Sequence, residues 1–184
     1  MNWLINAVRE KREAATTRPA MERTTSMKII SVDPGQRGGI ALLDGNRAEA
    51  WPMPGTVAQI VALIRSVSEP GDTLAVERAQ PMPKQGVTSV FTYGQHFGGF
   101  EAIAACLGLR YVTVRPAEWK KVMGLNSDKT SSIVEAERLF PGVNLIPVGC
   151  RKPHDGIAEA LLVGEYSRRL VLGSAKNFME RKEV

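Results

Sequence analysis

The sequence predicts an α/β fold in which helices flank a mixed central sheet, with an antiparallel meander followed by parallel strands. Three short runs of β-forming residues follow one another over residues 28–51, separated by glycine-containing turns. The next two runs, Thr73–Glu77 and Arg110–Val114, each come after a helical pattern, and strands that alternate with helices are typical of parallel pairing. A last helical pattern, from residue 156 to about residue 170, can then lie across this sheet.

The chain has 184 residues, enough for one domain with its own core. We expect residues 1–27 to form a flexible N-terminal extension, because this stretch ends in a polar segment without strand character, and residues 28–184 to form the folded domain. The net charge of +5 and the pI of about 9.4 favour a polyanionic partner. No apolar run approaches the roughly 18 residues of a membrane span, and no secretory signal is evident. We therefore expect a cytoplasmic protein without a membrane partner.

The two cysteines predict no zinc site. Cys106 and Cys150 are far apart and lack the paired spacing of zinc ligands. Cys106 falls within an apolar helical pattern, so we expect it in the core. Nothing in the sequence requires a disulfide between them, and a reducing compartment fits.

Residues 28–43 predict a hairpin whose first strand ends on a carboxylate, Asp33. Glycines at positions 35, 38 and 39 let the backbone turn tightly and let another group come close. An acid at the end of a buried strand, facing a glycine-lined gap, suggests a metal or phosphate site. The alternative is that Asp33 caps a turn, because Asp-Pro-Gly is a common turn sequence.

After a third short strand at residues 48–51, the pattern changes to a helix and then to a second strand that ends on an acid. Thr56 is a candidate N-cap, and apolar residues follow at helical spacing up to Ile64. The strand Thr73–Glu77 then places the carboxylate of Glu77 where the first strand has Asp33. The repeated placement is the first sign of a carboxylate cluster.

A long helix is predicted over residues 87–108, although three glycines, Gly94, Gly98 and Gly99, interrupt it. A glycine within a helix costs roughly 1 kcal/mol relative to alanine. Close packing against another backbone, a partner subunit or a nucleic-acid strand would explain these glycines.

Two shorter helices follow the strand Arg110–Val114. Pro116 opens the first, and Ser127 or Asp128 starts the second, which ends before residues 140–142. Lys129 falls in the first turn of the second helix, where a cation opposes the helix dipole. Lys129 is therefore placed to meet an anion.

The last helix carries two carboxylates, Asp155 and Glu159, on one face, because they are four residues apart. Apolar neighbours indicate that this face is at least partly buried, and a bound divalent cation would remove the repulsion between the acids. Alternatively, the Asp155 carboxylate interacts favourably with the positive end of the helix dipole, and Glu159 points to solvent.

Four carboxylates thus converge on one edge of the predicted sheet: Asp33, Glu77, Asp155 and Glu159. Oxygen ligands in this number suit Mg²⁺ or Mn²⁺ better than zinc. Two such ions about 3.5–4 Å apart can activate a water and stabilise the leaving oxygen of a phosphodiester. Nearby cations would then hold phosphates: Arg78, Lys84, Lys120, Lys121 and Lys129.

Five segments, in order, cover the chain from Lys28 to Arg169: SVDPGQRGGIALL, AVERAQPMPKQG, RPAEWKKVMGL, SDKTSSIVEAERLFP and KPHDGIAEALLVGEY. They resemble the RuvC-type Holliday-junction resolvases, and most closely the phage-borne and plant organellar branch. The resemblance implies an RNase H-like nuclease domain over residues 28–184 and a homodimer. It also implies Mg²⁺-dependent cleavage of four-way DNA junctions by paired symmetric nicks.

By position, Asp33, Glu77, Asp155 and Glu159 match the metal-binding acids of this family, which implies about two ions per site. Some relatives have a histidine in the first helix position, and here His154 and Asp155 are adjacent. We favour Asp155 as the ligand, because it lies four residues before Glu159, and His154 as a helper or phosphate contact.

Lys120 and Lys129 fall where the family has lysines for DNA contact or cleavage, and Lys129 joins the four acids as a catalytic candidate. The loop at residues 78–85 falls where some members push a side chain into the junction centre. The family's aromatic is absent there, so Met82 is the candidate wedge, while Trp119 suits core packing better than stacking on DNA. The expected DNA-binding residues are Arg78, Gln80, Met82, Lys84, Lys120, Lys121, Lys129 and His154.

Two other functions remain open: a nuclease of the same fold that acts on flaps, hybrids or general branched DNA, and a junction-binding module without catalysis. The four intact acids argue against the second. A nucleotide cofactor, as in the related ATPase fold, is not expected, because the sequence has no second phosphate loop.

Overall fold

The computed structural model describes residues 28–78, 86–126, 128 and 130–180. Predictions that fall on other residues lie outside this description. They concern the N-terminal extension at residues 1–27, the residues Gln80, Met82 and Lys84 of the loop after the fourth strand, and Lys129.

Five strands form one mixed sheet, as the sequence predicts. Their order is β3-β2-β1-β4-β5, with β1 in the centre. The pairs β1–β2 and β2–β3 are antiparallel, whereas β1–β4 and β4–β5 are parallel. The strands are β1 (Ile29–Asp33), β2 (Gly39–Asp44), β3 (Arg47–Pro52), β4 (Thr73–Glu77) and β5 (Arg110–Val114).

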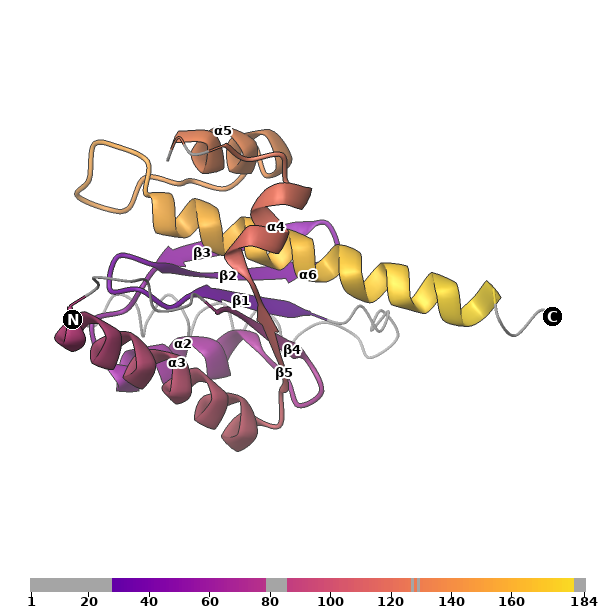
Figure 1. Cartoon of the computed structure of the whole chain (residues 1–184), viewed down its shortest axis with the longest axis horizontal. Coiled ribbons are helices and arrows are strands. Elements are labelled where there is room, and N and C mark those ends of the chain that lie inside the picture. The colour runs from indigo at the N-terminus through magenta and orange to yellow at the C-terminus, as the bar shows by residue number, and fades with distance from the viewer. Residues whose placement is uncertain (1–27, 79–85, 127, 129, 181–184) are drawn as a thin grey trace, which may run out of the picture.

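The described helices are α2 (Val57–Val67), α3 (Val87–Leu107), α4 (Pro116–Val122), α5 (Thr130–Leu139) and α6 (Asp155–Glu180). The predicted caps form: Thr56 Oγ1 accepts the Gln59 N–H at 3.3 Å, and Pro116 occupies the first turn of α4. The predicted end of the last helix was wrong. It runs to Glu180 rather than to about Leu170, and its far end projects beyond the sheet (Figure 1).

Helices cover the sheet on both faces, with α2 and α3 on one side and α4, α5 and α6 on the other (Figure 1). The side chains of β1 alternate between these layers. Ile30 and Val32 belong to the core shared with α2 and α3, while Ile29 belongs to the core shared with α6. Ser31 also faces α6, because its hydroxyl donates to the Ala160 carbonyl at 2.7 Å. The odd-numbered positions of β1 therefore point toward α6.

The first turn of α6 lies directly against the β1–β2 turn. A Cβ added to Gly156 would stand 2.2 Å from the Arg37 carbonyl oxygen, and one added to Gly39 would stand 2.6 Å from the Gly156 oxygen. Farther along α6, a Cβ on Gly164 would meet the Ser31 hydroxyl at 2.6 Å. The sequence predicts that glycines of the hairpin let another group come close, and in the structure that group is the backbone of α6.

One prediction about α3 was wrong, and one of the three explanations for its glycines is not supported. Cys106 is exposed rather than in the core, because the core-facing side of α3 is formed by other residues; Cys106 and Cys150 are both free thiols. Close packing within the chain does not explain Gly94, Gly98 and Gly99: a Cβ added to any of them has no described atom within 4 Å. Within the described part of the chain, nothing packs against these glycines.

We predict that Gly156→Ala lowers the free energy of unfolding by roughly 1–3 kcal/mol, because the new methyl group clashes with the Arg37 carbonyl and the turn must move. Urea denaturation measures the change. Gly142→Ala is the matched control, because a Cβ there meets no described atom within 4 Å. Equal stability of the two variants would contradict the tight contact.

Candidate active site

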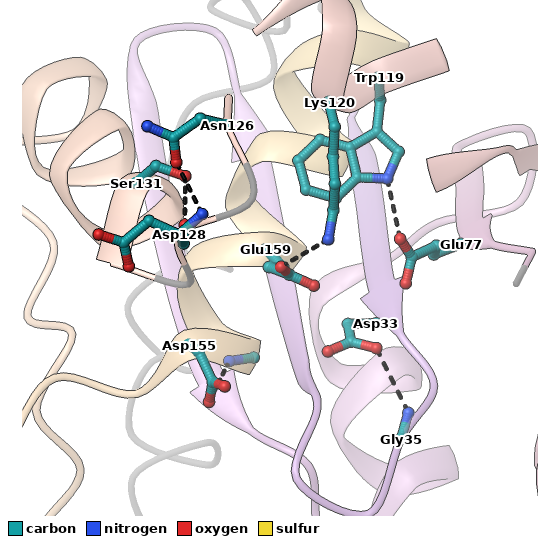
Figure 2. Close-up of polar contacts among 11 residues, drawn as sticks. Asp33, Gly35, Glu77, Trp119, Lys120, Asn126, Asp128, Ser131, Asp155 and Glu159 are labelled. Atoms are coloured by element: carbon teal, nitrogen blue, oxygen red, sulfur yellow. Dashed lines mark hydrogen bonds and ion pairs between the residues drawn. The ribbon is translucent and has the colours of Figure 1, made fainter. Parts of the chain in front are cut away.

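Asp33 and Glu77 end two neighbouring parallel strands, β1 and β4. Val32 pairs with Val76 in the register, so the acids that follow them stand side by side at the carboxyl ends of the strands. Asp33 has the same orientation as Ser31, whose hydroxyl reaches α6. The sheet therefore presents both carboxylates toward the α6 layer, as Figure 2 shows.

Glu159 completes this group from the second turn of α6. Its Oε1 accepts a hydrogen bond from Lys120 Nζ of α4 at 2.9 Å, and the ion pair is partly buried. Figure 2 shows Asp33, Glu77 and Glu159 around one space, with the Lys120 ammonium beside it. Three acids and one lysine thus share a small region at the edge of the sheet.

Burial and mutual repulsion make this cluster costly when it is ionised. Burial, with smaller contributions from the charges of Glu77 and Glu159, raises the pKa of Asp33 from 3.8 to about 7. The Gly35 N–H, which donates to Asp33 Oδ1 at 3.5 Å, and the Lys120 ammonium act in the opposite direction. Burial also raises the pKa of Glu77 above its ordinary value, against a hydrogen bond from Trp119. The cluster therefore favours either a proton or another cation.

Trp119 lies in the core, as predicted, but it also makes a polar contact that the sequence did not indicate. Its side chain is 0% exposed, and its Nε1–H donates to Glu77 Oε1 at 2.9 Å. The neighbouring Lys120 places its ammonium 5.0 Å from the centre of the indole ring. One short helix thus contacts acids from both the sheet and α6.

Asp155 and Glu159 line the same hollow of about 380 Å³ between the α4–α5 segment and α6. Asp155 Oδ1 accepts the Gly156 N–H at 3.1 Å, so Asp155 also serves the helix N-terminus. The charges that shift the pKa of Asp33 come from Glu77, Glu159 and Lys120, and Asp155 is not one of them. In Figure 2, Asp155 lies on the Asp128 side of Glu159, away from Asp33. The structure thus joins Asp155 to Glu159 but sets it apart from the strand acids.

His154 caps α6. Its ring Nδ1 accepts a hydrogen bond from the Ile157 backbone N–H at 3.3 Å, and its backbone N–H donates to the Leu145 carbonyl at 2.9 Å. One ring nitrogen is thereby engaged with backbone.

Among the described residues, Arg78 and Lys121 form no ion pair with the acids of the cluster, unlike Lys120. Arg78 is exposed, and its charge acts on Tyr111, whose pKa burial raises to about 12. Tyr111 packs in the α2–α3 layer, so Arg78 lies near the opposite face of the sheet. Lys121 is exposed on α4.

Several residues that support the site were not predicted from the sequence. From α3, the Tyr93 hydroxyl donates to the Glu77 carbonyl at 3.0 Å, and His96 Nδ1 lies 3.2 Å from the Pro34 carbonyl. Their spacing of three residues on a predicted helix was the available signal. The hollow is also lined by polar residues of the α4–α5 segment: Asn126, Asp128, Ser131 and Ser132.

As placed, no three Asp, Glu, His or Cys side chains among the described residues stand close enough to hold one metal ion. The chemistry of the cluster nevertheless fits a divalent cation. All its donors are carboxylate oxygens, which suit Mg²⁺ and Mn²⁺. Lys120 already supplies a positive charge there, paired with Glu159.

Of the helices in the described part of the chain, none has both the length and the apolar character of a bilayer crossing.

No family model matches the sequence, and no curated protein does either. Solved structures do match. "T. thermophilus RuvC in complex with Holliday junction substrate" is 17% identical, with 75% of this chain and 90% of that chain covered and a TM-score of 0.50. "Thermus thermophilus RuvC structure" is 16% identical, with coverages of 80% and 97% and a TM-score of 0.53. The chain therefore has the RNase H-like fold of RuvC, which confirms the predicted fold.

We predict that the metal-free protein loses stability as the pH rises from about 4 to about 7, because folded Asp33 keeps a proton that the unfolded chain has released. The loss is complete once the pH exceeds the folded pKa of about 7. Asp33→Asn removes this pH-dependent contribution. From pH 5 to pH 8, the free energy of unfolding of the variant should therefore increase relative to that of the wild type by on the order of 2 kcal/mol.

Urea denaturation in chelator at both pH values measures this difference. Glu118→Gln, at an exposed acid of α4, controls for the removal of one negative charge. Parallel pH profiles for the wild type and Asp33→Asn would contradict the raised pKa.

Proposed function

We propose that this protein is a Mg²⁺-dependent Holliday-junction resolvase that makes paired symmetric nicks in four-way DNA. The observation that carries the proposal is the partly buried group of Asp33, Glu77 and Glu159 at the carboxyl edge of β1 and β4, where burial and mutual repulsion raise the pKa of Asp33 and Glu77. The substrate class is supported by the RuvC of matching fold, whose structure contains a Holliday-junction substrate.

Asp33, Glu77 and Glu159 would hold the metal, with Asp155 contributing from the rim of the shared hollow. Two ions are proposed, as Mg²⁺ or Mn²⁺. When bound, they supply an activated water and stabilise the leaving oxygen of the phosphodiester. The protein itself contributes a partly buried group of carboxylates, held in fixed positions, that concentrates negative charge before the ions bind.

Lys120 has two roles in this proposal. In the metal-free protein its ammonium compensates Glu159 and lowers the pKa of Asp33 and Glu77. Once another cation neutralises the acids, Lys120 is free to contact the scissile phosphate. A lysine that changes partner in this way keeps the acids together before metal arrives.

The DNA-binding surface would continue from the acids along the segments next to them. The loop at residues 78–85 directly follows Glu77 in the chain and includes Gln80, Met82 and Lys84 as proposed junction contacts. Lys129 follows Asp128, which lines the hollow, so its chain position supports the proposed catalytic role. The remaining proposed phosphate contacts are Arg78, Lys121 and His154.

We propose a homodimer with α3 at its interface, which would place two sites on opposite strands of a junction. The exposed side of α3 carries mainly small or apolar residues, among them Val87, Phe91, Gly94, Gly98 and Ala102, together with one charged residue, Glu101. Exposed apolar residues that gather on one face often mark a surface that a partner covers. A second copy could approach closely over Gly94 and Gly98, because nothing described lies within 4 Å of a Cβ there.

The direct test is cleavage of a labelled four-way junction, a matched duplex and a flap, with Mg²⁺ or with chelator. Symmetric nicks in the junction alone, abolished by chelator, would support the resolvase. Equal cutting of all three substrates would indicate a nuclease for general branched DNA. Junction binding without cutting in Mg²⁺ or Mn²⁺ would indicate a binding module.

We predict that Asp33→Asn and Glu159→Gln each reduce junction cleavage by about a thousandfold or more while junction binding stays within a few fold, because each removes a metal-binding charge. Single-turnover cleavage and gel-shift titration measure the two effects. Glu118→Gln, at an exposed acid outside the cluster, is the control. Normal cleavage by either site variant would show that the cluster is not the catalytic centre.

We predict that Gly98→Gln converts the dimer to a folded monomer. The new side chain blocks close approach, while the higher helix propensity should stabilise the monomer by up to about 1 kcal/mol. Light scattering after size exclusion and thermal unfolding measure these effects, with Gly142→Gln as the surface control. A wild-type monomer, or an unchanged dimer in the variant, would exclude this interface.

A further inference from the structure

Trp119 is fully buried, and it also donates a hydrogen bond to one of the proposed metal-binding acids. Among the described residues it is the largest of the fully buried side chains, at 0% exposure, and it packs in the α6-side core. A tryptophan with this burial still needs a partner for its indole N–H. Here the partner is a carboxylate of the proposed catalytic cluster, Glu77, at 2.9 Å.

The indole N–H fixes one end of the Glu77 side chain. Glu77 is 7% exposed, and among the described residues no second donor reaches its carboxylate. The backbone of Glu77 is held by other contacts. Its carbonyl accepts a hydrogen bond from the Tyr93 hydroxyl, and Glu77 pairs with Val114 of β5 in the sheet. Rotation of the carboxylate would therefore leave both the indole N–H and Glu77 Oε1 without a partner, which is costly in a buried setting.

Trp119 is itself held on both sides. Its ring packs in the core, and the Lys120 ammonium lies 5.0 Å from the ring centre while it pairs with Glu159 at 2.9 Å. Figure 2 shows these adjacent side chains of α4 reaching the two acids, Trp119 toward Glu77 and Lys120 toward Glu159. The orientation of Glu77 is thus tied to the position of α4.

We propose that Trp119 is a positioning residue, whose indole N–H holds the Glu77 carboxylate in the orientation that binds the divalent cation. This inference rests on the proposed function, because it assigns Glu77 to the metal. Residues that hydrogen-bond a metal ligand fix its orientation, and their loss typically weakens metal affinity by about 10- to 100-fold. Trp119 touches neither metal nor DNA in this proposal.

The test is direct Mn²⁺ binding to the full chain without DNA, measured by calorimetry and by electron paramagnetic resonance. Trp119→Phe keeps an aromatic ring but removes the N–H donor. A second variant places β-(3-benzothienyl)alanine at position 119, which keeps the shape of the bicyclic ring and replaces only the N–H by sulfur. Trp51→Phe is the matched control, because Trp51 is partly buried and packs against the core on the other face of the sheet from the acids.

We expect both position-119 variants to bind Mn²⁺ about tenfold or more weakly than the wild type, with Trp51→Phe unchanged. The Mg²⁺ concentration for half-maximal junction cleavage should rise by a similar factor, while junction affinity in chelator stays the same.

Wild-type Mn²⁺ affinity in the benzothienyl variant would overturn the inference and leave the proposed function standing, even if Trp119→Phe fails to fold. Failure of the wild type to bind Mn²⁺ or cut a junction would overturn the proposed function and this inference together.

Discussion

The contact between the first turn of α6 and the β1–β2 turn is the constraint on which the rest of the site depends. Gly39 and Gly156 leave no room for a side chain between the two backbones. The Ser31 hydroxyl and Gly164 continue this close contact along α6. Since α6 cannot slide without breaking it, Glu159 is held over the strand ends that carry Asp33 and Glu77.

This close approach has an electrostatic cost that α4 offsets. Packing three carboxylates into a partly buried space raises the pKa of Asp33 to about 7. Lys120 supplies positive charge to the group, and Trp119 donates to Glu77. If the cluster binds a divalent cation as proposed, that cation would offset the repulsion among the acids, and folding would be coupled to metal binding.

Most of the fold could be predicted, because its signals are local. Alternating apolar residues, Pro116, Thr56 and the turn glycines mark strands, caps and breaks within a few residues. The two strand acids could also be predicted, since parallel strands align their carboxyl ends. The Trp119–Glu77 hydrogen bond could not, because no sequence spacing relates an indole on α4 to a strand end. Likewise, the exposure of Cys106 depends on how α3 rotates against the sheet, and a helix with small and apolar residues on several faces gives little sign of that rotation.

The acids and their support come from segments spread from Asp33 to Glu159, with β4 and α4 between them. A growing chain on the ribosome therefore lacks the complete cluster until α6 has emerged and docked on the hairpin. The same holds for fragments that proteolysis cuts before α6. If the cluster cleaves DNA as proposed, incomplete chains are harmless to the genome without a separate inhibitor.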